Sequence, residues 1–174
     1  MAAFLWGGHG STAAESAPAG TVQLGAPHAP GFSLMPSNAT GIRFQNRVPE
    51  SRHLTNAILL NGSGVALGDV DGDGRCDLYF CHLNGTNALY RNLGDWRFEE
   101  ITSTSGVGCE GLTSTGAVLS DLDGDGDLDL VVNTVGQGTR LFWNDGRGRF
   151  DAGAVVNPRV AGTTAAVADV DGDG

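Results

Sequence analysis

Aspartates recur at alternate positions in two short loops of this 174-residue chain. The first loop, residues 69–77, reads DVDGDGRCD, and the second, residues 121–129, reads DLDGDGDLD. Both loops therefore carry Asp at their positions 1, 3, 5 and 9. Two unit negative charges about 4 Å apart repel by roughly 4 kcal/mol at an effective dielectric constant of about 20. Such a concentration of carboxylates in one turn predicts a divalent cation at their centre.

Calcium is the cation that these side chains fit best, because it takes about six to eight oxygen ligands from flexible loops. Glycine at position 6, Gly74 or Gly126, allows the sharp turn that lets alternate side chains converge. Magnesium demands a tighter octahedron and is second choice, while zinc and copper fit poorly because no His or Cys recurs at ligand spacing. We predict about one Ca²⁺ per complete loop. The predicted ligands are Asp69, Asp71, Asp73, Asp77 and the Arg75 carbonyl; Asp121, Asp123, Asp125, Asp129 and the Asp127 carbonyl; and Asp169, Asp171 and Asp173.

An EF-hand and a metal-free turn fit these loops less well. An EF-hand needs a bidentate Glu at position 12 between two helices, whereas position 12 here is Phe80 or Val132 inside a strand-like run. A metal-free Asp-Gly hairpin turn would explain one copy, but the same register in successive copies argues against it. Under the calcium hypothesis, Asp129→Ala is expected to lower stability only when calcium is bound.

The loops belong to a longer internal repeat. Residues 64–98 align without a gap with residues 116–150, and 14 of the 35 positions are identical. A third copy begins at residues 165–174, AAVADVDGDG, and this sequence ends before its ninth position. A period near 50 residues is typical of repeat architectures. We place the repeats at about 57–108, 109–156 and 157–174.

Each complete repeat contains four strand-like runs separated by turns rich in Gly, Asn and Asp. The first copy gives GVALG, LYFCH, ALYRN and RFEEIT, and the second gives GAVLS, LVVN, TRLFWN and a weaker run from RF. Consecutive apolar residues in LYF and LVV indicate strands covered on both faces. A flat array of hairpins would leave those faces in water. The pattern therefore predicts an all-β β-propeller of four-stranded antiparallel blades, present as an incomplete fragment of about two and a half blades.

Composition limits the function classes. The net charge is −10, and 12 of the 20 acidic residues lie in the three loop segments, so the acidity is local and no basic stripe offers a nucleic-acid surface. No apolar run approaches the roughly 20 residues of a membrane span. Residues 1–40 are rich in Ala, Gly, Ser and Pro, and we expect a disordered leader or linker there. Residues 41–174 form the predicted partial propeller.

Residues outside the loops favour structural roles. Trp96 and Trp143 could form a sugar-stacking platform, but they do not align between repeats, so packing at strand ends is expected. His53 and His82 lack a nucleophile motif, and partly buried, hydrogen-bonded histidines are expected. Cys76, Cys81 and Cys109 form no CxxC pair. Buried free thiols are favoured for them, and a Cys81–Cys109 or Cys76–Cys109 bridge stays open in an exported protein.

Two segments carry a family resemblance. GVALGDVDGDGRCDLYF and GAVLSDLDGDGDLDLVV resemble the FG-GAP/VCBS repeats of integrin α-like propellers. NGSGVALGDVDGDGRCDLYF, NALYRNLGDWRFEEITSTSGV and the preceding GIRF resemble the cartilage acidic protein/ASPIC-UnbV group of secreted repeat proteins. The resemblance covers about residues 41–174. It implies a propeller in which each calcium loop joins the first and second strands of its blade.

We therefore expect a non-enzymatic, calcium-binding propeller with a scaffold, adhesion or ligand-binding role. Secreted, periplasmic or cell-surface placement is expected, because such loops fill reliably only where calcium is abundant. The expected partners are a protein or glycan ligand and further blades of the same polypeptide, without nucleic acid or a membrane span. The alternatives are a lectin, or an accessory module of a secreted polysaccharide- or lipid-degrading enzyme.

Overall fold

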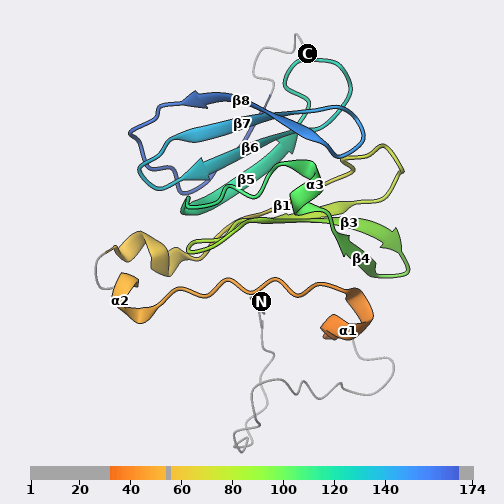
Figure 1. Cartoon of the computed structure of the whole chain (residues 1–174), viewed down its shortest axis with the longest axis horizontal. Coiled ribbons are helices and arrows are strands. Elements are labelled where there is room, and N and C mark those ends of the chain that lie inside the picture. Colours follow the sequence, from red (N-terminus) through yellow and green to blue (C-terminus); the bar gives the residue numbers. More distant parts are fainter. Residues whose placement is uncertain (1–31, 54–55, 169–174) are drawn as a thin grey trace, which may run out of the picture.

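The computed structural model describes residues 32–53 and 56–168, which form two stacked four-stranded antiparallel sheets (Figure 1). The strand order is β1-β2-β3-β4 in the first sheet and β5-β6-β7-β8 in the second, so each sheet is a simple meander. This arrangement confirms the predicted all-β class and the incomplete propeller, which is not closed. The strands are β1 (Val65–Gly68), β2 (Asp77–Phe80), β3 (Ala88–Gly94), β4 (Arg97–Glu100), β5 (Ser114–Ser120), β6 (Asp129–Thr134), β7 (Thr139–Asn144) and β8 (Phe150–Val156).

The helices are single turns in the connections. They are α1 (Ser37–Thr40), α2 (Glu50–His53), the 3-10 helix η1 (Ala57–Asn61) and α3 (Thr102–Ser105). Within the part of the chain that the structure describes, no helix is both long enough and apolar enough to cross a bilayer. Residues 1–31 of the predicted leader lie outside the described residues, and its boundary stays a prediction.

Strand pairing fixes both acidic loops in the same way. Gly68 pairs with Asp77 at the end of the β1–β2 hairpin, and Ser120 pairs with Asp129 at the end of the β5–β6 hairpin. The ninth position of each loop is therefore the first residue of the second strand. β1 lies against β5. The acidic loops that follow these two strands therefore lie at the same end of the sheets (Figure 1).

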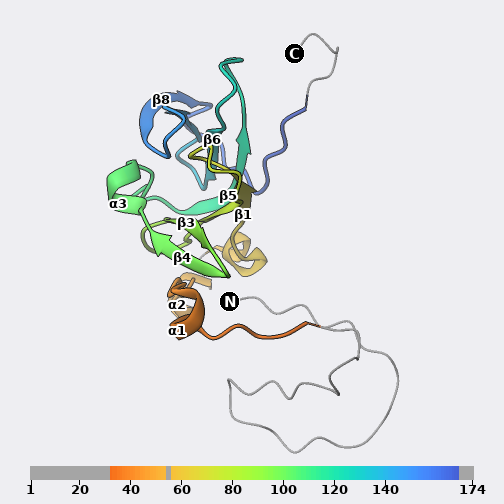
Figure 2. The ribbon, with the colours of Figure 1, turned by 90° about the vertical axis from the view of Figure 1, so that its right-hand side faces the viewer.

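The core lies between the two sheets. Tyr79 and Cys81 point into it from the first sheet, and Leu130 and Val132 from the second, all fully buried. The opposite face of β2 is covered as well, because Phe44 stacks on Phe80 with ring centroids 5.0 Å apart. Figure 1 shows the connection from α1 toward α2 running beside the first sheet, and Figure 2 shows α1 and α2 next to β4, on the side of the first sheet away from β8. Covering on both faces explains the consecutive apolar residues of the second strands.

The innermost strands of the two sheets touch through glycines. The Gly64 backbone N–H donates to the Thr115 carbonyl at 2.9 Å, and a Cβ on Gly64 would lie 2.8 Å from the Cα of Gly116. Gly116 in turn faces the backbone of the third repeat, where its Cβ would lie 3.3 Å from the Thr163 carbonyl oxygen. The onset of the third repeat thus docks on the second sheet as the second sheet docks on the first.

This close approach gives a test of blade packing. Gly64→Ala is expected to lower the free energy of unfolding by about 1–3 kcal/mol, because the new methyl group meets backbone atoms that cannot rotate away. The neighbouring exposed position provides the control, Val65→Ala, which should cost less than about 1 kcal/mol. Urea denaturation measures both, and a Gly64→Ala protein as stable as the wild type would contradict the packing.

A helical turn that ends in glycine precedes each sheet. α1 ends at Gly41 with φ of 80°, and α3 ends at Gly106 with φ of 76°, the left-handed region where glycine is unstrained. Gly41 lies against the Phe98 carbonyl and Gly106 against the Phe150 carbonyl. Because Phe98 and Phe150 are aligned repeat positions, the two turns occupy equivalent places at the outer strands of their own sheets.

Candidate metal centres

Each acidic loop gathers three carboxylates. Each residue of a triad offers one carboxylate oxygen, and these oxygens all lie within 4.8 Å of one another. The triads come from positions 1, 3 and 9, so the structure brings together three of the four aspartates that were predicted as ligands at positions 1, 3, 5 and 9 of each complete loop. They are Asp69, Asp71 and Asp77 in the first loop and Asp121, Asp123 and Asp129 in the second.

The carboxylate at position 1 holds its own loop in a curl. Asp69 accepts backbone N–H bonds from Gly72 at 2.9 Å and from Gly74 at 2.8 Å, and Asp121 accepts the equivalent bonds in the second loop. Burial alone would raise the pKa of Asp69, but the N–H bonds of the loop, led by that of Gly74, bring the pKa below its usual value. The carboxylate therefore stays ionised, which is the form that binds a cation.

The carboxylate at position 9 ties the loop to the neighbouring strands. Asp77 is 0% exposed and accepts the backbone N–H of Val70 at 3.0 Å and that of Asn92 in β3 at 2.7 Å. Asp129, 1% exposed, accepts the same pair of bonds at 3.0 and 2.9 Å from the second loop and from β7. These side chains have a structural role as well as a place in the triads.

Burial, and after it the charges of neighbouring aspartates, raise the pKa of two of these carboxyl groups. Burial raises the pKa of Asp77; its two N–H bonds oppose that rise, and the charges of Asp71 and Asp73 add to it. The pKa of the exposed Asp123 is also raised, first through desolvation and then through the charges of neighbouring aspartates. A cation between these groups would offset both effects.

The first loop also contains a buried acceptor without a donor. Asp71 Oδ1 is buried and has no hydrogen-bond partner among the described residues, while Asp71 Oδ2 lies 2.7 Å from Arg91 Nε. A buried carboxylate oxygen without a partner is energetically costly. Together with the all-oxygen triads, this orphaned atom fits a hard cation such as calcium.

Position 5 lies outside the triads. Asp73 forms an ion pair with the Arg75 side chain and accepts the Arg75 backbone N–H at 2.9 Å, and Asp125 accepts the backbone N–H of Asp127 at 2.9 Å. Ligation by position 5 and by the carbonyls at position 7 stays a prediction. The third-loop candidates Asp169, Asp171 and Asp173 lie outside the described residues.

Two asparagines support the loops and were not assigned a role from the sequence. Asn92 donates its side-chain N–H to the Cys76 carbonyl at 2.9 Å. Asn144 donates to the Leu128 carbonyl at 3.1 Å and also reaches the Val70 carbonyl in the first loop at 2.9 Å. Their recurrence at aligned positions was the signal that could have identified them.

The other sequence candidates have mixed outcomes. Trp96 is 69% exposed in the β3–β4 turn, so the expectation that it packs at a strand end is wrong. Trp96 has a positive φ of 60° in the hairpin turn that joins the last two strands of the first sheet. His82 is half-buried, accepts the Asn84 backbone N–H at 2.9 Å and meets Phe44 edge-on, as predicted. The side chain of His53 lies outside the described residues.

All three cysteines are free thiols. Cys81 and Cys109 are buried, as predicted, and burial raises the pKa of Cys81 to about 12. Cys76 is exposed in the first acidic loop, so the expectation of burial is wrong there.

Comparison with known proteins places these loops in a family context. A family model described as FG-GAP-like repeat matches residues 69–132 and 121–174, which together are more than half of the chain. Cartilage acidic protein 1 of Xenopus tropicalis is 33% identical over 81 residues, and the human protein is 30% identical over 81 residues. These alignments cover 47% of this chain and only 12% of each relative.

Proposed function

The chain belongs to the FG-GAP-like repeat family, and from that premise we propose that it is a calcium-binding section of an extracytoplasmic β-propeller. Its role is that of a scaffold, adhesion or ligand-binding module rather than an enzyme. The observation that carries the proposal is the repetition of one geometry, since both loops gather carboxylates at positions 1, 3 and 9. A single cluster of acidic side chains is common on protein surfaces without a bound ion, but two clusters at the same positions of a repeat are not.

Bound calcium would supply the positive charge that three converging carboxylates need. The chain contributes the rest of the site. Asp69 and Asp121 curl the loops through backbone N–H bonds, and Asp77 and Asp129 fix the loops to the adjacent strands. Calcium is thus proposed to have a structural role, in which it holds the hairpin that joins the first two strands of each blade.

The proposed location follows from affinity. Calcium sites of extracellular modules bind with a Kd of about 10⁻⁴–10⁻³ M, a concentration met outside the cytoplasm. The relatives' name, cartilage acidic protein, agrees with an extracellular setting for those proteins. We propose a secreted, periplasmic or cell-surface protein whose partners are further blades of the same polypeptide and a protein or glycan ligand.

Calcium titration of the chain by isothermal calorimetry tests this proposal. We expect one ion per complete loop, and loss of one ion in each of Asp69→Asn and Asp121→Asn. Asp151→Asn removes an exposed carboxylate on β8 and serves as the matched control, with binding unchanged. Absence of calcium uptake by the folded wild-type chain would overturn the proposed function.

A further inference from the structure

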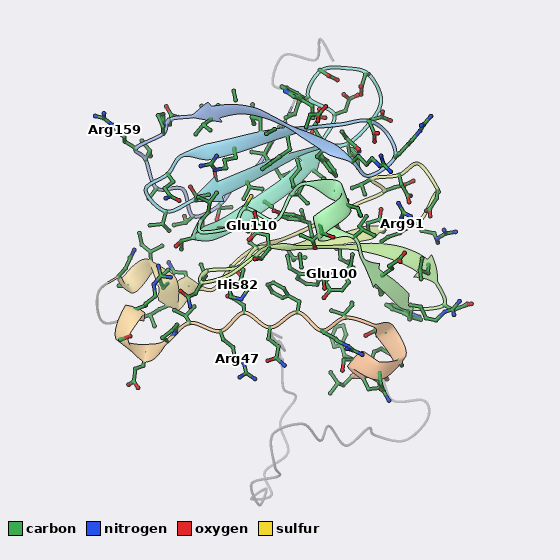
Figure 3. The ribbon with its side chains drawn as sticks, viewed as in Figure 1. Arg47, His82, Arg91, Glu100, Glu110 and Arg159 are labelled. Carbon is green, nitrogen blue, oxygen red and sulfur yellow. The ribbon has the colours of Figure 1, made fainter. Side chains whose placement is uncertain are left out.

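An arginine side chain from a neighbouring strand lies beside the first acidic loop. Arg91 extends from β3 toward Asp71 at the loop end of the sheets (Figure 3). Its Nε lies 2.7 Å from Asp71 Oδ2, with the Asp71 side chain 11% exposed and that of Arg91 34% exposed. Arg91 Nε makes no aligned hydrogen bond, so the contact is chiefly an attraction between charges. The guanidinium therefore lies directly beside one member of the triad.

The second loop lacks this cation. The position aligned with Arg91 is Trp143, and the ion pairs of the described residues do not involve residues 121–129. Position 7 also makes the first loop less negative than the second. It is Arg75 in the first loop, where it pairs with Asp73, and Asp127 in the second loop. The four aspartates and Arg75 give residues 69–77 a formal charge of −3, which the adjacent Arg91 reduces to −2, while the five aspartates of residues 121–129 give −5.

We propose that the two loops are unequal calcium sites and that Arg91 is the residue that weakens the first. This inference rests on the proposed function. A guanidinium a few ångströms from the ion repels it and competes with it for Asp71. The second loop therefore fills first as calcium rises. When calcium falls, the first loop loses its ion first but keeps partial neutralisation by Arg91. The second loop holds its ion to a lower calcium concentration and has no adjacent arginine to replace it once that ion is lost.

The loops offer a separate reporter for each site. The Gly74 backbone N–H donates to Asp69 at 2.8 Å, and the Gly126 N–H donates to Asp121 at 3.0 Å. Each amide N–H donates to a carboxylate of one triad, so its NMR chemical shift reports calcium binding at that triad. In a calcium titration of the wild-type chain, the Gly126 signal is expected to reach its midpoint at a calcium concentration about tenfold or more below that of Gly74.

Substitution of Arg91 tests the assignment. Arg91→Gln is expected to move the Gly74 midpoint about tenfold or more toward lower calcium and to leave the Gly126 midpoint unchanged. Arg91→Lys keeps the charge and should retain the weak first site. Arg159→Gln removes the same charge from an exposed position at the opposite end of the sheets (Figure 3) and should change neither midpoint.

The outcomes separate this inference from the proposed function. Equal midpoints in the wild type, or a Gly74 midpoint that Arg91→Gln leaves in place or moves to higher calcium, overturn the inference while calcium binding stands. Absence of any calcium-dependent shift at either glycine overturns both. Should Arg91→Gln fail to fold, Asp127→Asn provides the complementary test, since loss of one negative charge should move the Gly126 midpoint toward higher calcium.

Discussion

Asp129→Ala is expected to lower the free energy of unfolding by about 3 kcal/mol even in the presence of a chelator. The carboxylate is 1% exposed and accepts the backbone N–H groups of Leu122 and Asn144. Alanine leaves both donors without a partner, and each buried unsatisfied donor costs about 1–3 kcal/mol. Urea denaturation in chelator measures the effect. This expectation replaces the prediction from sequence that Asp129 matters for stability only when calcium is bound.

Asp121→Ala provides the matched control within the same triad. Asp121 is exposed, and its N–H donors, Gly124 and Gly126, can turn to water when the carboxylate is removed. Both variants should lose calcium binding at the second loop, but Asp121→Ala should cost less than about 1 kcal/mol in chelator. Equal losses for the two variants in chelator would contradict the bridging role of Asp129.

Removal of calcium from both loops is expected to lower the melting temperature of the wild-type chain by about 10–20 °C. A ligand at about 100 times its Kd stabilises the folded state by about 2.7 kcal/mol per site, and 1 kcal/mol corresponds to about 2–4 °C for a domain of this size. Differential scanning calorimetry with calcium and with excess chelator measures the shift. Magnesium should restore only part of it, because Mg²⁺ fits an octahedral site better than a flexible loop. Identical melting curves in calcium and chelator would contradict a structural role for the ion.

The repeat and the architecture could be predicted because local chemistry determines them. The two aspartate loops recur 52 residues apart, and this repeat predicted a hairpin around each of them. The consecutive apolar residues of β2 and β6 indicated strands covered on both faces. The convergence of Asp69, Asp71 and Asp77 also follows from alternate spacing around Gly74. In such loops the side chains and the turn that brings them together are close in sequence.

The contacts that were missed depend on chain segments that are distant in sequence. Arg91 meets Asp71 because β3 returns beside the first loop, and the spacing of 20 residues carries no sign of this contact. The buried bonds of Asp129 arise in the same way, since β7 supplies one of the two donors. Asp73 forms an ion pair with Arg75 inside the first loop, and the second loop cannot repeat that pair because it has Asp127 at the aligned position. Ligation by Asp73 stays a prediction.

Anomalous X-ray diffraction from crystals of the calcium-loaded chain tests the central claim most directly. We predict one strong anomalous peak within the triad of Asp69, Asp71 and Asp77 and a second within that of Asp121, Asp123 and Asp129. Oxygen atoms should surround each peak at about 2.3–2.6 Å. Diffraction from calcium-soaked crystals with no peak at either triad, or with peaks only at other surface carboxylates, would contradict the claim.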